Sequence, residues 1–299
     1  MNSFQVVKDF ERELCNYTGA PYAVSTTSCT MALLLAVAWN LRSVSPWLKA
    51  CEKKVAENLP PDFPDFRLRY QVEIPKRTYV SVPQSIIHAG GRPTFRDEDW
   101  RGAYQLKPLP VWDSARWFTH GMYQRPSLGR IEHLGLRAKS VRVLAEEGIH
   151  DVSELVCWTP EDLLKTPNLG PHCLLDIETS LAGRKLKLSQ ERWHDMPWHE
   201  RGTMVCVSFH WAKTLGIQQG GAILHDNPEA DAWLRRARFD GREEGVAPKE
   251  QKAWQLGWHA YMSPETAAAG LVRLALLPRH NDPLPNDDYP DLSTFEIFK

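Results

Sequence analysis

The stretch CVSFHWAKTLGIQQGGAIL, residues 206–224, places a single lysine in an otherwise uncharged run. Its apolar ends predict two short buried strands, at residues 204–209 and 220–224, joined by a connection that carries Lys213. A buried lysine is unfavourable unless it is paired or chemically used. Because α/β proteins carry reactive side chains on loops held by a rigid sheet, we expect Lys213 to belong to a functional site. A structural ion pair is the alternative.

Around this stretch, strands and helices alternate through most of the chain. The pattern predicts helices at residues 4–16, 29–41 and 82–88, and strands in PYAVSTTS, YQVEIP, RPTFRD and PLPVWDSA. Such alternation predicts an α/β domain with a parallel or mixed sheet covered by helices. Residues 43–68 are expected to form an irregular connection, and residues 280–299 a polar tail lying on the surface.

The pattern changes between residues 124 and 198, where strand signals vanish. Short helices are predicted at residues 131–134, 138–147, 152–155, 160–165 and 171–181. Since insertions into exposed loops are well tolerated, the simplest account is a helical domain inserted into an α/β domain. The α/β domain would then comprise residues 1–123 and 199–299, and the insert residues 124–198.

The composition is that of an ordinary globular protein, with 42% hydrophobic residues, 24% charged residues and a net charge of −1 over 299 residues. The overall charge gives no reason to expect a nucleic-acid or anionic membrane partner. There is neither a stretch of transmembrane length nor a signal-peptide pattern, and the six cysteines form no C-x-x-C pair. His194 and His199 lack the spacing of a helical zinc site. We therefore expect a cytoplasmic protein without a disulfide framework or a metal.

Two further features complement Lys213. Ser28-Cys29-Thr30 lies at a strand-to-helix turn, where free amides can bind phosphate or where the hydroxyls simply cap the helix. Asp113 ends an apolar strand, where it can pair with a ring nitrogen or act as a cap. A phosphate cradle, a carboxylate and a buried amine match the phosphate, the pyridine nitrogen and the aldehyde of pyridoxal 5'-phosphate. Lys213 would form a Schiff base with that aldehyde.

Five segments in the same order make the resemblance specific: FERELCNYTGAPYAVSTTSCTMALLLA, IPKRTYVSVPQSIIHAGGRPTF, VWDSARW, VSFHWAKTLGIQQGGAIL and GWHAYMSPETAAAGLVRL. They resemble the DegT/StrS-type sugar aminotransferases, which are fold-type I pyridoxal phosphate enzymes. The resemblance covers most of residues 4–123 and 199–275. It implies a three-layer αβα large domain with a mostly parallel sheet, and a C-terminal small domain that is largely missing from this chain.

The resemblance also implies roles for individual residues. Lys213 would be the Schiff-base lysine, Asp113 the partner of the pyridine nitrogen, and Tyr79 would stack on the ring. The phosphate would be held by Ser28, Cys29, Thr30 and Ser208.

Some positions depart from the family pattern. Arg116 stands where the family has glutamine or histidine near the phenolic oxygen of the coenzyme. His259 replaces an asparagine that reaches the coenzyme phosphate of the partner subunit, and Tyr261 replaces an arginine. Cys29 replaces a glycine.

The implied function is transfer of an amino group from a small-molecule donor to a keto or aldehyde acceptor, a nucleotide-linked keto-sugar, in a homodimer. Decarboxylation and elimination stay open as reaction types, because pyridoxal phosphate enzymes carry them out with the same lysine and the same electron-accepting ring. One alternative is a pyridoxal phosphate enzyme acting on a modified nucleotide or DNA base. Another is a non-catalytic scaffold that retains the fold.

The inserted segment LGLRAKSVRVLAEEGIHDVSELVCWTPEDLLKTPNLGPHCLLDIETSLAGRKLKLS resembles the C-terminal domain of the bacterial RNA polymerase α subunit, with EDLLKTPNLG as its helix-hairpin-helix element. The resemblance implies contacts with the DNA backbone from Arg137, Lys139, Arg142 and Gly170. Basic and acidic residues balance between Gln124 and Arg192. Because DNA affinity needs clustered positive charge, a structural or protein-binding role stays open.

Overall fold

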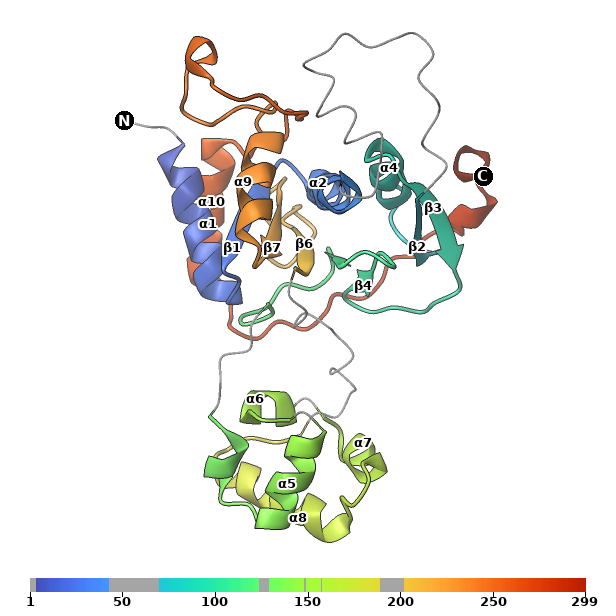
Figure 1. Ribbon diagram of the computed structural model, residues 1–299, viewed down its shortest axis with the longest axis vertical. Coiled ribbons are helices and arrows are strands. Elements are labelled where there is room, and N and C mark those ends of the chain that lie inside the picture. The colour runs from blue at the N-terminus through green and yellow to red at the C-terminus, as the bar shows by residue number, and fades with distance from the viewer. Residues whose placement is uncertain (1–3, 43–69, 124–128, 148, 157, 189–201) are drawn as a thin grey trace. The chain divides into compact units, whose positions relative to one another are not determined.

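The computed structural model describes residues 4–42, 70–123, 129–147, 149–156, 158–188 and 202–299. The predicted connection at 43–68 lies outside these residues. The chain divides into two compact units (Figure 1): unit 1 comprises residues 1–123 with 199–299, and unit 2 comprises residues 124–198. None of the described helices is long and apolar enough to cross a membrane.

Unit 1 is built on a five-stranded sheet. Its strand order is β1 (Tyr22–Thr26), β7 (Gly221–His225), β6 (Met204–Ser208), β5 (Val111–Ser114) and β4 (Tyr104–Gln105). Within this sheet β5 and β6 are parallel, whereas the other described neighbours are antiparallel. A second, two-stranded sheet pairs β2 (Gln71–Pro75) with β3 (Arg92–Arg96) in parallel. The α/β class is confirmed.

The expectation of a mostly parallel sheet is wrong for the five described strands, which form a mixed sheet. The reason lies in the connections. A parallel neighbour needs a long crossover, usually a helix, to carry the chain back. Residues 209–220 between β6 and β7 form no helix, and only five residues separate β4 from β5, so both pairs are antiparallel.

The predicted helices of unit 1 are present. Helix α2 (Cys29–Arg42) is apolar on nearly all sides, with ten of its fourteen residues buried. It therefore packs within the core, against β6 and β7 and against α4 (Ser81–His88) and α9 (Pro228–Ala237). Helix α1 (Gln5–Thr18) is amphipathic, and it packs on β1 and on α10 (Pro264–Leu276).

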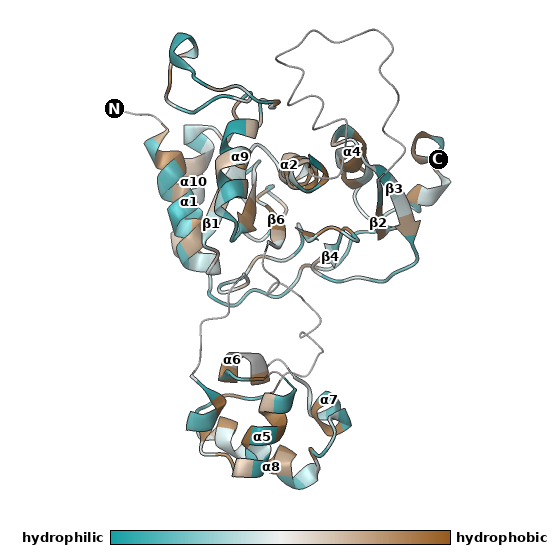
Figure 2. Cartoon of the chain, viewed as in Figure 1, coloured by the Kyte–Doolittle hydropathy of each residue, from teal (hydrophilic) through white to brown (hydrophobic). Residues whose placement is uncertain are grey.

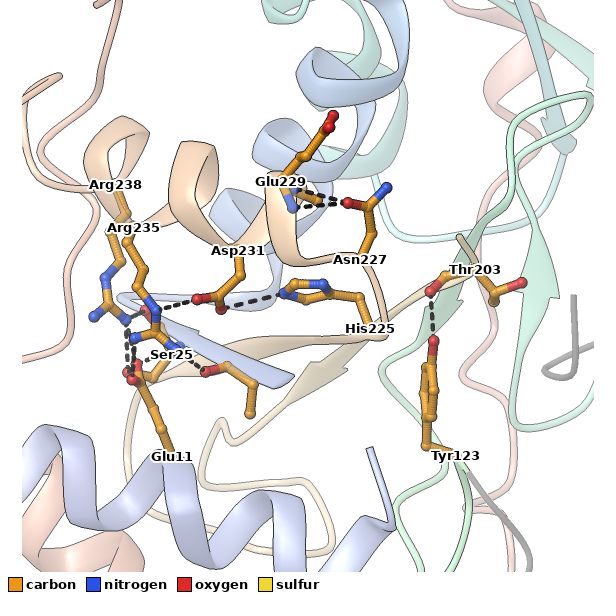
Figure 3. Close-up of polar contacts among 12 residues, drawn as sticks. Glu11, Ser25, Tyr123, Thr203, His225, Asn227, Glu229, Asp231, Arg235 and Arg238 are labelled. Carbon is orange, nitrogen blue, oxygen red and sulfur yellow. Dashed lines mark hydrogen bonds and ion pairs between the residues drawn. The ribbon is translucent and has the colours of Figure 1, made fainter. Parts of the chain in front are cut away.

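A buried charged cluster joins α1, β1 and α9 (Figure 3). Glu11 of α1 accepts hydrogen bonds from the Ser25 backbone nitrogen at 2.9 Å and from its hydroxyl at 2.7 Å. The same carboxylate pairs with Arg238 and, at 2.6 Å, with Arg235. Burial opposes ionisation, but the charges of Arg238 and Arg235 together hold the pKa of Glu11 below its usual value. Glu11 is therefore a charged carboxylate inside the core.

The two points where unit 1 meets the inserted segment are tied together. The Tyr123 hydroxyl donates a hydrogen bond to the Thr203 carbonyl at 2.9 Å (Figure 3). The Tyr123 backbone nitrogen also donates to the Thr18 carbonyl at 3.0 Å. Unit 1 thus fixes both ends of the insertion with its own residues.

The elements described in unit 2 are helices, and they lie where the sequence predicts them: η2 (Ile131–Leu134), α5 (Ala138–Glu146), α6 (Val152–Leu155), α7 (Pro160–Lys165) and α8 (Pro171–Ala182). Helix α5 carries both hydrophobic and hydrophilic residues (Figure 2), as an amphipathic surface helix does. Its buried side chains join a core that includes Leu144, Leu163 and Ile177 and that is drawn entirely from unit 2.

The C-terminal residues correct one expectation. The sequence predicts a polar tail on the surface, but Leu292 is fully buried and Phe298 is nearly so. The Leu292 backbone nitrogen donates to the Lys76 carbonyl at 2.9 Å, and Phe298 packs on Phe95 with ring centroids 6.0 Å apart. The aspartates and prolines of this segment indicate a surface position, yet Leu292 and Phe298 are buried against the rest of unit 1.

Candidate active site

Unit 1 contains a cavity of about 530 Å³ at the carboxyl ends of β5 and β6 and at the N-terminus of α2. Eight residues that the sequence singles out line it: Ser28, Cys29, Thr30, Tyr79, Asp113, Arg116, Ser208 and Lys213. The cavity therefore gathers groups that lie as far apart as 185 positions in the sequence.

Asp113 is fixed by its neighbours. It lies on the fully buried strand β5, directly opposite Tyr104 of β4. One carboxylate oxygen accepts from the Tyr104 hydroxyl at 2.7 Å, and the other accepts from the Ala115 backbone nitrogen at 2.9 Å. Burial raises the pKa of Asp113, while these two hydrogen bonds and the charge of Lys213 act in the opposite direction. The carboxyl is oriented and desolvated, which suits it to pair with a cationic N–H.

Tyr104 is a site residue that the sequence analysis missed. Its hydroxyl also contacts the Thr78 hydroxyl at 2.6 Å, so Asp113, Tyr104 and Thr78 form a chain of hydrogen bonds. No local pattern around Tyr104 marks it, because the contact arises from the pairing register of β4 with β5.

Lys213 lies in the connection between β6 and β7, as predicted. Its backbone nitrogen donates to the His210 carbonyl at 2.8 Å. Within the described residues, its ammonium group has no hydrogen bond and no ion pair. Burial lowers the pKa of Lys213, and the nearby charge of Arg116 lowers it further, whereas Asp287 and Asp113 raise it. The net effect is a lowered pKa, which increases the fraction of neutral amine, the nucleophilic form.

The N-terminus of α2 offers donors to the cavity. Among the described residues, nothing accepts a hydrogen bond from the Cys29 or Thr30 backbone nitrogen. The Thr30 hydroxyl contacts the Ser81 hydroxyl at 2.8 Å. A Cβ atom on Gly221 would lie 2.5 Å from the Cys29 nitrogen, so only glycine lets β7 pass this close to the helix start. Unpaired amides at the start of a fourteen-residue helix favour an anion.

Ser28 bears out the capping alternative for its own hydroxyl. That hydroxyl accepts a hydrogen bond from the Met31 backbone nitrogen at 3.2 Å. The capping role and the anion cradle are compatible, because the cap uses the third amide of the turn and leaves the amides of Cys29 and Thr30 available.

Arg116 is engaged by residues near the C-terminus. Its Nη1 lies 2.5 Å from the Asp287 carboxylate and 3.3 Å from the Tyr289 hydroxyl, and its Nη2 donates to the Pro285 carbonyl. Its Nε is buried and has no hydrogen-bond partner among the described residues. Asp287 and Tyr289 line the cavity together with Trp100. The sequence analysis missed Asp287 and Tyr289 because it assigned them to a surface tail.

His259 is not among the residues that line the cavity. Its side chain is exposed, its Nδ1 lies 3.2 Å from Asp240, and its ring packs against Tyr261 with centroids 4.6 Å apart. The contact expected of His259 is with the coenzyme of a partner subunit, which a single subunit does not test. That role stays a prediction.

The residues of the cavity fit pyridoxal phosphate. The unpaired amides of Cys29 and Thr30 match its phosphate, and the oriented carboxyl of Asp113 matches its ring nitrogen. The unpaired amine of Lys213 matches its aldehyde, and the buried Arg116 Nε is a donor still available to an acceptor. The described residues contain no cluster of three or more potential metal ligands.

The residues expected to contact nucleic acid lie along α5 and directly before α5 and α8 of unit 2. Arg137 precedes α5, and its backbone nitrogen donates to the Asp176 carboxylate at 3.0 Å. Lys139 and Arg142 are exposed on α5, and Arg142 lies 3.8 Å from Glu146. Gly170 is the residue before α8. These positions leave the proposed DNA contacts a prediction.

Both resemblances noted in the sequence are confirmed by comparison with protein-family models. Residues 1–44 and 191–283 match the DegT/DnrJ/EryC1/StrS aminotransferase family. Residues 125–183 match the C-terminal domain of the alpha subunit of bacterial RNA polymerase. The first match falls on both sides of the second, as an insertion requires.

Solved structures similar to the chain include NtdA from Bacillus subtilis with bound cofactor PMP, at 16% identity and a TM-score of 0.46. The sugar aminotransferase CalS13 from Micromonospora echinospora matches at 16% identity and a TM-score of 0.48. The matches cover 91% and 90% of the present sequence but 48% and 60% of those proteins. The chain thus spans about half to three fifths of their length.

Proposed function

We propose that this protein, whose unit 1 matches the DegT/DnrJ/EryC1/StrS aminotransferase family on both sides of the insertion, is a pyridoxal-phosphate-dependent aminotransferase. One observation carries the proposal: Asp113, Lys213 and the start of α2 line a single cavity. Nothing in the packing of unit 1 requires a lysine without a described partner beside a buried carboxyl. When bound, the coenzyme supplies an aldehyde for amine exchange and a conjugated ring that accepts electrons.

Lys213 performs two tasks in this proposal. Its Nζ would hold the coenzyme at its aldehyde. With a substrate amine bound in its place, Nζ would serve as the general base and acid that takes a proton from the substrate α carbon and gives it back to the bound reactants. The lowered pKa of Lys213 supports both tasks, because a larger fraction of the amine is neutral near pH 7.

Asp113 would keep the ring nitrogen protonated, and its hydrogen bonds from Tyr104 and Ala115 hold both carboxylate oxygens in place. The amides of Cys29 and Thr30, with the hydroxyls of Thr30 and Ser208, would bind the phosphate. Tyr79, which is 58% exposed at the cavity, has an aromatic face available for the ring.

For the acceptor we propose a keto or aldehyde group on a nucleotide-linked sugar. The resemblance of five segments to sugar aminotransferases supports this choice. The exposed amide side chains of Gln218 and Gln219 line the cavity and can bind sugar hydroxyls. We also propose a homodimer, in which His259 would reach the coenzyme phosphate of the partner subunit.

The test is the visible absorption of the purified protein with added pyridoxal phosphate. The proposal expects a yellow complex in the wild type and none with Lys213→Ala. Asp113→Asn keeps the shape of the side chain but removes its charge, so a complex should form whose spectrum is shifted. Equal spectra for the wild type and Lys213→Ala would overturn the proposal.

The match of residues 125–183 favours a second candidate, in which unit 2 contacts DNA and the enzyme acts on a modified nucleotide or base. Lys139 and Arg142 would supply the phosphate contacts. Binding of DNA by the full-length protein should then weaken steeply with salt. It should also weaken in a Lys139→Glu, Arg142→Glu variant. Unchanged binding in that variant would exclude the candidate.

A further inference from the structure

Residues 281–291, the C-terminal strap, run along one edge of the cavity. The Leu284 backbone nitrogen donates to the Arg116 carbonyl at 2.8 Å, and the Asn281 carbonyl accepts from the Trp117 indole at 3.1 Å. Farther along, the strap inserts Asp287 and Tyr289 into the cavity lining. The strap therefore brings a carboxylate to the site from the far end of the sequence.

The ion pair between Arg116 and Asp287 is unequal. The Arg116 side chain is only 9% exposed, whereas the Asp287 side chain is 61% exposed and lies on a segment without regular structure. Leaving a buried guanidinium without an anion is strongly unfavourable. Moving an already exposed carboxylate fully into water, by contrast, changes the free energy little. Asp287 is thus the member of the pair that can be exchanged for another anion.

The place that the Asp287 carboxylate occupies beside Arg116 lies in the same cavity as Lys213. Arg116 and Asp287 both lie close enough to Lys213 for their charges to shift its pKa. In an α-amino acid the carboxylate is bonded to the same α carbon as the amine. A substrate whose amine and α carbon are at Lys213 would therefore carry its carboxylate toward Arg116. The planar guanidinium matches a carboxylate better than other side chains do.

We propose that Arg116 is the receptor for the carboxylate of an α-amino acid, and that Asp287 of the C-terminal strap occupies this position until the amino acid arrives. This inference rests on the proposed function and names the class of its amino donor. The strap then acts as a built-in competitor: the incoming carboxylate replaces Asp287 at Nη1, and the Asp287 carboxylate returns to water.

L-alanine and L-alaninol test the proposal, since both carry the amine and only L-alanine carries the carboxylate. Their affinities are measured by calorimetry on the coenzyme-free full-length protein, and by the change in visible absorption on the coenzyme-loaded protein. The wild type should prefer L-alanine. Asp287→Asn should bind L-alanine about fivefold more tightly and L-alaninol unchanged. The matched control is Asp282→Asn on the same strap, where the carboxylate pairs with His280, and it should behave as the wild type.

Arg116→Gln should lose the preference for L-alanine. Arg116→Lys keeps the charge but not the planar guanidinium that donates two parallel hydrogen bonds, so it should retain part of the preference. Thermal unfolding of both variants checks that they fold. Unchanged L-alanine affinity in Asp287→Asn, or a retained preference in folded Arg116→Gln, would overturn the inference. If the coenzyme attaches to Lys213 and yet L-alanine and L-alaninol bind alike, this inference fails while the proposed function stands. Failure of the coenzyme to attach at all would count against the proposed function.

Discussion

Substitution of Glu11 by glutamine should strongly destabilise unit 1. Glu11 is 4% exposed and pairs with Arg238 and Arg235, and the Arg238 side chain is itself 1% exposed. Glutamine keeps the size of the side chain but leaves two guanidinium groups without their shared anion. Breaking a buried pair from one side costs about 3–5 kcal/mol. Arg238 keeps Glu244 at 3.3 Å and Arg235 keeps Asp231 at 2.7 Å, so we expect about 3 kcal/mol.

The free energy of unfolding is measured by urea titration, with tryptophan fluorescence as the signal. Glu13→Gln is the matched control, because Glu13 lies on the same helix with its side chain 43% exposed and contacts Arg12 and Asn16 at the surface. It should change stability by less than about 0.5 kcal/mol. A loss below about 1 kcal/mol in Glu11→Gln would show that the cluster does not stabilise unit 1 as argued.

The stabilities of the wild type and Glu11→Gln should also depend differently on pH. The pKa of Glu11 is lowered in the folded state, so its contribution is complete above the unfolded value of 4.5 and is lost as the pH falls through the folded pKa. The stability difference between the wild type and Glu11→Gln should therefore be constant near pH 6–7 and shrink below about pH 4.5. A difference that persists unchanged to about pH 3 would contradict the assigned ionisation.

Three further predictions concern the cavity and the insertion. Gly221→Ala should lose about 1–3 kcal/mol of stability in urea titration and bind pyridoxal phosphate more weakly, because its Cβ would meet the Cys29 nitrogen. Gly170→Ala, with nothing within 4 Å of the new atom, is the control and should change little. Arg116→Gln should raise the pKa of Lys213, so the rate of coenzyme attachment should reach its plateau at higher pH; an unshifted profile would contradict the charge argument. Replacing residues 125–201 with a short glycine-serine linker should leave unit 1 cooperatively folded by circular dichroism, since Tyr123 and Thr203 fix the ends; loss of the folded state would refute this.

The elements that the sequence predicts well are those with a strong local pattern. Helix α2 is apolar on all sides, and β6 and β7 are short apolar runs, so type and position follow from the residues themselves. Lys213 and Asp113 are recognisable for the same reason, because a charge in or beside such a run is unusual. What the sequence could not supply is pairing between distant segments.

Strand order is the clearest case, because β1 (Tyr22–Thr26) pairs with β7 (Gly221–His225), which is far from it in the sequence. The contact of Tyr104 with Asp113 depends on strand register, and that of Arg116 with Asp287 joins positions 171 apart. The composition of the strap indicates a surface segment, because prolines and aspartates dominate it. The cavity residues of the strap and the buried Leu292 that follows it become visible only once the protein is folded.

The central claim is that Lys213 is the amine that holds the coenzyme. The most direct measurement is peptide mapping by mass spectrometry after the protein is incubated with pyridoxal phosphate and reduced with borohydride. The account predicts the added mass on the peptide that contains Lys213, at one equivalent per subunit, and its absence when the aldehyde of the coenzyme has first been condensed with a competing amine such as hydroxylamine. Label spread over surface lysines, or a Lys213 peptide that stays unmodified, would contradict it.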